Sequence, residues 1–120
     1  MAIELKETDG GKTLEVFLRG NLVKEDYATF VPAVDRALAM HDKIRMLVVM
    51  HDFHGWTASA MWEDTKFGVR HFRDLDRLAM VGETKWQHGM AVFCKPFTTA
   101  TVRYFEHDQI EEARAWLRET

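Results

Sequence analysis

Hydrophobic residues run almost without interruption through residues 44–50 and 78–81, and an amphipathic segment separates the two runs. Strands that are apolar on both faces lie between covering helices, which is typical of a mainly parallel sheet. The pattern therefore predicts a strand–helix–strand unit. Because ligands collect at the carboxyl ends of such strands, we expect a site at residues 51–56, a predicted loop rich in titratable and aromatic side chains.

Alternating apolar positions in residues 3–5 and 14–18, joined by turn residues 9–12, predict an opening β-hairpin. Apolar residues then recur at helical spacing from Val23 to Leu38. Pro32 lies inside this segment. Since proline removes a helical hydrogen bond, we expect a kink or a late restart near Val31.

A second helix is expected to begin near Thr57 or Ser59, because either hydroxyl can cap it. Its predicted inner face consists of Ala58, Met61 or Trp62, Thr65, Val69 and Phe72. A short helix opening at residues 84–87, a strand at 100–105 and a last helix opening at 108–111 complete the pattern. The predicted order is ββαβαβαβα, an α/β fold with a mixed, mainly parallel sheet covered by helices.

Composition narrows the function. The 120 residues, of which 47% are hydrophobic, predict a single domain spanning residues 1–120. A net charge of −3 without a basic cluster disfavours nucleic acid and anionic membranes as partners. Cys94 is the only cysteine, so no internal disulfide forms, and no signal peptide or apolar run of about 20 residues is present. We therefore expect a cytoplasmic protein without a membrane span.

Short motifs along nearly the whole chain resemble one family. They are Glu25-Asp26-Tyr27, Asp52-Phe53 with Gly55-Trp56, Trp62-Glu63-Asp64 with Lys66-Phe67-Gly68, Arg70-His71, Ala79-Met80-Val81-Gly82, Trp86, Val102-Arg103-Tyr104-Phe105 and Ala113-Arg114-Ala115-Trp116-Leu117. In this order they look like the bacterial SpoIIAA-like family of small proteins. The resemblance implies the STAS-type fold of anti-sigma-factor antagonists and a ligand-binding role without an established reaction.

One departure from the antagonists concerns regulation. Their helix after the central strand starts with an Asp-Ser-Ser-Gly motif, in which a serine is phosphorylated. This chain has Thr57-Ala58-Ser59-Ala60 there, so hydroxyls are present and the motif is not. Thr57 and Ser59 are the candidate regulatory residues.

Aromatic residues near the predicted carboxyl edge suggest an apolar pocket with a few orienting polar groups. The candidate ligand-binding residues are Asp52, Phe53, Trp56, Trp62, Lys66, Phe67, His71 and Trp86. The alternative is that these aromatic side chains only fill the core between helix and sheet.

Other chemistries are less well supported by the spacing. His51, Asp52, His54, His71 and His88 do not form a recognised ligand pattern, so we predict no metal and no cofactor. No Gly-x-Ser-x-Gly elbow accompanies Ser59, which disfavours a nucleophile activated by Asp52 or His54. An enzyme with Asp52 and His71 as acid and base is the least favoured hypothesis.

The sequence therefore supports two functional hypotheses. The leading hypothesis is a non-enzymatic module that binds a small, partly apolar molecule as a carrier or sensor. The alternative is a regulatory module that binds a partner protein around residues 57–62, as anti-sigma-factor antagonists do. A homodimer through the hairpin edge or the strand at 100–105 is possible in either case.

Overall fold

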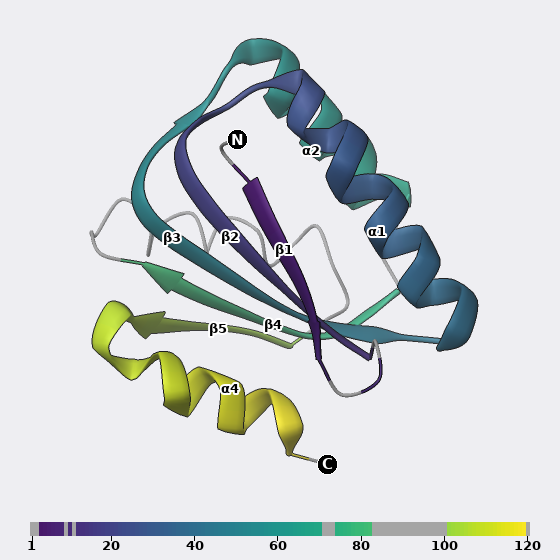
Figure 1. Cartoon of the computed structure of the whole chain (residues 1–120), viewed down its shortest axis with the longest axis vertical. Helices are drawn as coiled ribbons and strands as arrows, with labels where there is room; N and C mark the ends of the chain where they lie inside the picture. Colours follow the sequence, from purple (N-terminus) through teal and green to yellow (C-terminus); the bar gives the residue numbers. More distant parts are fainter. Residues whose placement is uncertain (1–2, 9, 11, 71–73, 83–100, 120) are drawn as a thin grey trace.

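A computed structural model of the chain describes residues 3–8, 10, 12–70, 74–82 and 101–119. Its helices and strands, labelled as in Figure 1, are β1 (Ile3–Thr8), β2 (Thr13–Leu22), α1 (Tyr27–Met40), β3 (Ile44–Trp56), α2 (Ala58–Arg70), β4 (Leu75–Gly82), β5 (Thr101–Glu106) and α4 (Ile110–Arg118). Single 3-10 turns, Lys24–Asp26 and His107–Gln109, precede α1 and α4. The helix predicted to open at residues 84–87 lies outside the described residues.

The strands form one five-stranded sheet in the order β1-β2-β3-β4-β5. β1 pairs with β2 antiparallel, and the other neighbours pair parallel. Helices α1 and α2 lie on one face of this sheet and α4 lies on the other (Figure 1). The predicted hairpin, the mainly parallel sheet and its helical cover are therefore confirmed.

Each face of the sheet has its own hydrophobic core. The larger core packs the inward residues of α1, among them Phe30 and Val34, against β1–β5. The smaller core joins β3 and β4 to α4 through Leu47, Val81 and Leu117, all nearly inaccessible to solvent. Because both faces are covered, the central strands are apolar on both sides, as their sequence predicts.

Helix α1 runs uninterrupted from Tyr27 to Met40 with Pro32 inside it, so the predicted restart near Val31 is wrong. The helix tolerates the proline because its apolar stripe is anchored on both sides of that position, by Phe30 before it and Val34 after it. Tertiary packing thus outweighs the lost hydrogen bond.

Helix α4 is held to the sheet by arginines as well as by apolar contacts. Arg114 binds the buried carboxylate of Glu15 on β2 through two hydrogen bonds, Nε to Oε2 and Nη2 to Oε1, each 3.1 Å long. At the C-terminal end of α4, Arg45 and Arg77 donate to the carbonyl oxygens of Trp116, Leu117 and Glu119. These donors satisfy acceptors that a helix end otherwise leaves unpaired.

Within the described residues, the helices are too short or too polar to cross a membrane.

Candidate functional site

The candidate site lies where β3 ends and α2 begins. Residues 51–56 are not the predicted loop: β3 continues through them to Trp56 and pairs with β2, where Gly20 faces Phe53 and Leu22 faces Trp56. Part of the backbone of this polar segment is therefore paired with a neighbouring strand. A hydrogen bond of 2.9 Å from the Thr57 N–H to the Leu22 carbonyl closes this end of the pair.

Two irregularities bend this extension. The register between β2 and β3 shifts on both sides of Gly20, and β3 contributes the extra residues. Gly20 has φ +65° and Asp52 has φ +51°, both in the left-handed region. Extra residues on one strand increase local bending and twist, and Figure 1 shows the ends of β2 and β3 curving together away from the rest of the sheet.

Three of the predicted ligand-binding residues, Asp52, Phe53 and Trp56, lie on this bent part of β3, and their environments differ. Asp52 is exposed at the bulge, whereas Phe53 is 6% exposed and belongs to the larger core. The backbone of Trp56 ends β3, and its side chain lies outside the described part of the structure. Of these three residues, only Asp52 is shown to reach solvent.

Thr57 and Ser59 have different environments. The Thr57 Oγ1 accepts a hydrogen bond of 3.2 Å from the Ala60 N–H, so Thr57 is the N-cap of α2, as predicted. Ser59 is exposed on the first turn, and its hydroxyl makes no hydrogen bond to any described residue. A modification of Ser59 would leave the capping oxygen untouched, while one of Thr57 would alter the capping group itself.

The outer side of α2 carries an exposed tryptophan. Ser59, Trp62, Glu63 and Lys66 are spaced three or four residues apart and therefore share one side of the helix. Trp62 is 63% exposed, and the Lys66 Nζ lies 3.0 Å from the Glu63 Oε1. We call these four residues the α2 outer surface.

The predicted inner face of α2 is wrong at Ala58, which is exposed. Trp62, the alternative to Met61 on that face, is exposed as well, and the side chain of Met61 lies outside the described part of the structure. The described inward residues are instead Ala60, which is fully buried, and Phe67, which packs against the core. The rings of Phe67 and Phe30 lie 4.8 Å apart between their centroids, and this contact fixes how α2 is rotated on α1.

The predicted ligand-binding residues thus separate into two groups. Phe53 and Phe67 belong to the core, whereas Trp62 and Lys66 lie on the α2 outer surface. His71 and Trp86 lie outside the described residues. Trp62 and Phe67 lie on different sides of α2, so they do not line one pocket together.

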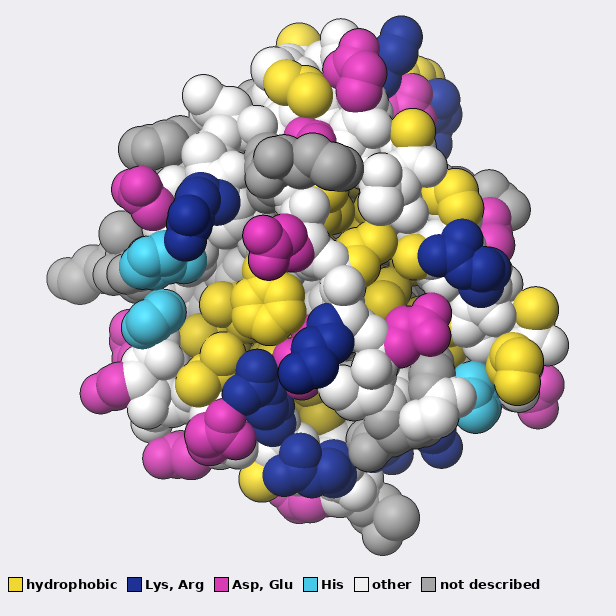
Figure 2. Space-filling model, viewed as in Figure 1, with side chains coloured by type: hydrophobic (Ala, Val, Ile, Leu, Met, Phe, Trp, Pro, Cys, Tyr) yellow, Lys and Arg dark blue, Asp and Glu magenta, His cyan; other side chains and the backbone are white. Residues whose placement is uncertain are grey.

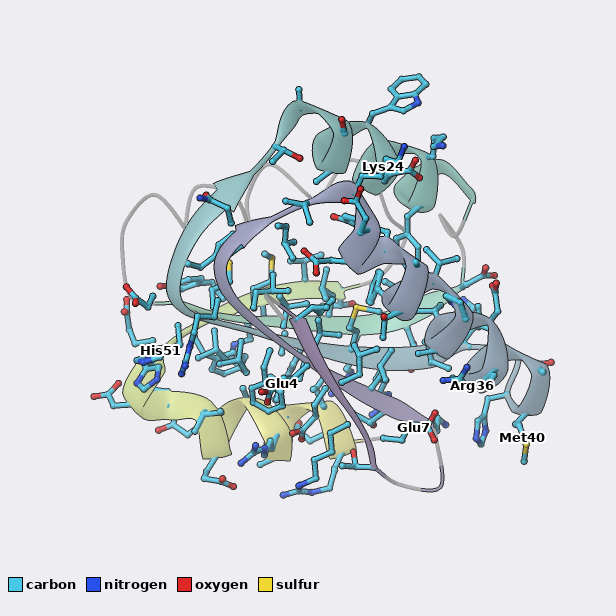
Figure 3. All side chains as sticks on the ribbon, turned by 45° about the horizontal axis from the view of Figure 1, so that its top comes forward. Glu4, Glu7, Lys24, Arg36, Met40 and His51 are labelled. Atoms are coloured by element: carbon cyan, nitrogen blue, oxygen red, sulfur yellow. The ribbon has the colours of Figure 1, made fainter. Side chains whose placement is uncertain are left out.

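Sequence reasoning did not single out two residues that lie near α2. Helix α2 lies against the 3-10 turn Lys24–Asp26, and Figure 3 shows Lys24 beside it. Val23, just before this turn, is 38% exposed. Its N–H donates to the Asp26 Oδ2 at 2.9 Å. The acidic pair Glu25-Asp26 lies within the segment that the apolar pattern predicts to be helical from Val23 onward, so the pattern does not separate this turn from α1.

The described histidines form no cluster suited to a metal ion: no group of three metal-ligating side chains occurs among the residues that the structure describes. His51 on β3 and His107 on the turn before α4 stack with their ring centroids 5.3 Å apart. Two exposed imidazoles alone do not complete a coordination shell.

This fold, a hairpin followed by parallel strands with helices on both faces, defines a mixed α/β module of the STAS type. The sequence profile of the SpoIIAA-like family matches residues 13–118, so the chain belongs to the SpoIIAA-like family. A solved structure described as an uncharacterized protein with a SpoIIAA-like fold, from Shewanella loihica PV-4, is similar to it with a TM-score of 0.79 and 25% identity, covering 97% of this chain and 92% of that one. No functionally curated protein matches the sequence.

Proposed function

We propose that this protein is a non-enzymatic regulatory module that binds a partner protein through the α2 outer surface. The observation that carries the proposal is Trp62, an indole that is 63% exposed at the middle of that surface. Tryptophan is enriched among the residues that dominate the energy of protein interfaces. A partner of matching chemistry has an apolar pocket for the indole and polar groups around it.

The setting of Trp62 suits an anchor. On the opposite side of the same helix, Ala60 and Phe67 fix α2 to the core, so the indole projects from a rigid element. Glu63 and Lys66 form an ion pair next to it. Exposed charge pairs contribute little to affinity themselves, but they surround the anchor with polar groups that select a complementary partner.

Ser59 offers a means of regulation. It lies one turn before Trp62, where side chains three residues apart are neighbours. Phosphorylation would add a charge of about −1.5 to −2 beside the anchor. Because negative charge is favourable in the first turn of a helix, the modification would change docking without unfolding α2.

Substitution of the anchor tests the proposal. We expect Trp62→Ala to weaken partner capture about 30-fold, the effect of losing an interface anchor worth about 2 kcal/mol. The matched control is Met40→Ala, which removes another exposed apolar side chain, 77% exposed at the end of α1. Affinity capture from an extract of the source organism, compared by quantitative mass spectrometry, should recover a protein with the wild type and Met40→Ala but not with Trp62→Ala. Equal capture by all three would contradict the proposal.

The regulatory part has its own test. Ser59→Asp should change recovery of the same partner, whereas Ser59→Ala should not, and both variants should melt like the wild type because Ser59 is exposed. If Ser59→Asp and Ser59→Ala capture equally, the serine has no regulatory role, even where Trp62 proves to be the anchor.

The small-ligand role stays a prediction, because the side chains of three of its candidate residues, Trp56, His71 and Trp86, lie outside the described part of the structure. Native and denaturing mass spectrometry of the purified protein checks it: a mass that is lost on denaturation indicates a bound molecule, and an unchanged chain mass in both states speaks against a carrier.

A further inference from the structure

The outer edge of β1 is the starting point. Among the described strands, β1 pairs on one side only, with β2, and so ends the sheet. Figure 1 looks onto this edge, and no helix passes in front of β1. An open edge presents unpaired backbone donors and acceptors, which another strand can bind.

Successive side chains of β1 point to opposite faces of the sheet, and two that share a face carry opposite charges. Glu4 and Lys6 are exposed and two residues apart, so they share the face of the sheet that carries α4. Figure 3 shows Glu4 on that side and Glu7 on the side of α1. Acidic and basic side chains are interspersed over this part of the molecule in Figure 2. Neither Glu4 nor Lys6 forms an ion pair with any other residue that the structure describes.

We propose that β1 binds the β1 of a second copy, antiparallel and centred on Leu5. In this register Glu4 lies opposite the partner copy's Lys6, and Lys6 lies opposite its Glu4, so the two-fold axis creates two ion pairs on one face. Leu5 meets its own copy on the other face. Two five-stranded sheets then join into one continuous sheet.

The charges select this register. A shift that centres the pairing on Glu4 places two glutamates opposite one another, and a centre on Lys6 places two lysines opposite one another. Like charges directly across a strand pair are destabilising. A shift by one residue would turn the charged side chains of the two copies to different faces.

A lysine on an edge strand often discourages pairing, which is the competing explanation for Lys6. That explanation assumes that no acidic residue of the incoming strand lies opposite the lysine. Here Glu4 supplies its counter-charge in a self-paired strand, so the same residue specifies the partner instead. The two explanations give opposite predictions for the mass of the protein in solution.

Charge reversal tests the proposal by sedimentation velocity over a range of concentrations. The wild type should dimerise, and Glu4→Lys should weaken the dimer about fivefold or more, because two attractive cross-strand pairs become repulsive. Glu7→Lys is the matched control: it makes the same change of charge on the same strand, where Ile3 of the other copy lies opposite. A monomeric wild type, or equal weakening by both substitutions, would overturn the proposal.

A mixture of two charge-reversal variants tests the register by restoring a dimer that each variant alone has lost. Lys6→Glu should also dissociate, yet an equimolar mixture of Glu4→Lys and Lys6→Glu should restore a dimer, because their charges are complementary in this register. If both variants fold and the mixture stays monomeric, the register is wrong.

Cross-linking of the wild type avoids any loss of folding. A zero-length carbodiimide should join Glu4 to Lys6 between copies, which mixed ¹⁴N- and ¹⁵N-labelled protein reveals as a heavy–light peptide pair. Dimers without this link would refute the register. Trp62 lies on α2, so these outcomes do not depend on the partner-binding proposal.

Discussion

The ion pair between Glu15 and Arg114 permits a quantitative prediction. The Glu15 side chain is only 5% exposed, and both of its oxygens accept from the Arg114 guanidinium, whose side chain is 25% exposed. Replacing Arg114 by Met keeps much of the apolar stem but removes the donors. A buried carboxylate would then remain without its charged partner.

The expected cost follows from the burial. Removing one partner of a fully buried ion pair costs about 3–5 kcal/mol. Since Arg114 retains partial contact with water, we place the loss for Arg114→Met at about 2–3 kcal/mol. For a chain of 120 residues, this lowers the melting temperature by roughly 8–12 °C.

Urea unfolding monitored by circular dichroism measures this loss, and two further variants identify its cause. Arg114 also binds Glu111, which is 75% exposed, so Glu111→Ala should cost no more than about 0.5 kcal/mol. The double variant Glu15→Leu with Arg114→Met replaces the pair by apolar side chains and should recover most of the loss.

The pH dependence adds a check. The hydrogen bond to Glu15 raises the pKa of Arg114 above its ordinary, strongly basic value, against the opposing effect of burial. A raised pKa means that this stabilisation is present at all lower pH values and is lost only in strong alkali. Arg114 itself therefore adds no pH dependence between pH 4 and 8. A deficit as small as that of Glu111→Ala, or no recovery in the double variant, would refute the reasoning.

Two smaller perturbations concern the candidate site. Thr57→Ala should cost about 1 kcal/mol, because the Ala60 N–H loses its cap, and Thr57→Ser, which keeps the hydroxyl, should cost much less in the same urea assay. Gly20→Ala should cost about 1–2 kcal/mol from backbone strain alone, because φ is +65° and no atom lies within 4 Å of the added Cβ. A Gly20→Ala variant as stable as the wild type would show that this bend relaxes without penalty.

Periodicity predicted most of the described fold because each element follows a single local rule. β4 is apolar on both faces, and α4 places Ala113 and Leu117 on one side. Such patterns depend only on which faces are covered. The rotation of α2 was not predictable in this way, since it depends on Phe67 meeting Phe30 of another helix. Trp62 is large and apolar, and the sequence alone does not distinguish a core tryptophan from an exposed one.

The extension of β3 shows why residues 51–56, whose composition is typical of a loop, were wrongly predicted to be one. β3 pairs with β4 only as far as Val49, and beyond this point β2 is its one partner among the described strands. A strand with one neighbour tolerates polar residues, and among the described strands this is the setting in which His51 and Asp52 are exposed while Phe53 belongs to the core. A segment with loop-like composition can therefore be an edge strand, and the distinction lies in the non-local pairing with β2. The bent pair of strands also joins directly to the cap of α2, through the bond between Thr57 and Leu22, so the position of the α2 outer surface depends on that bend.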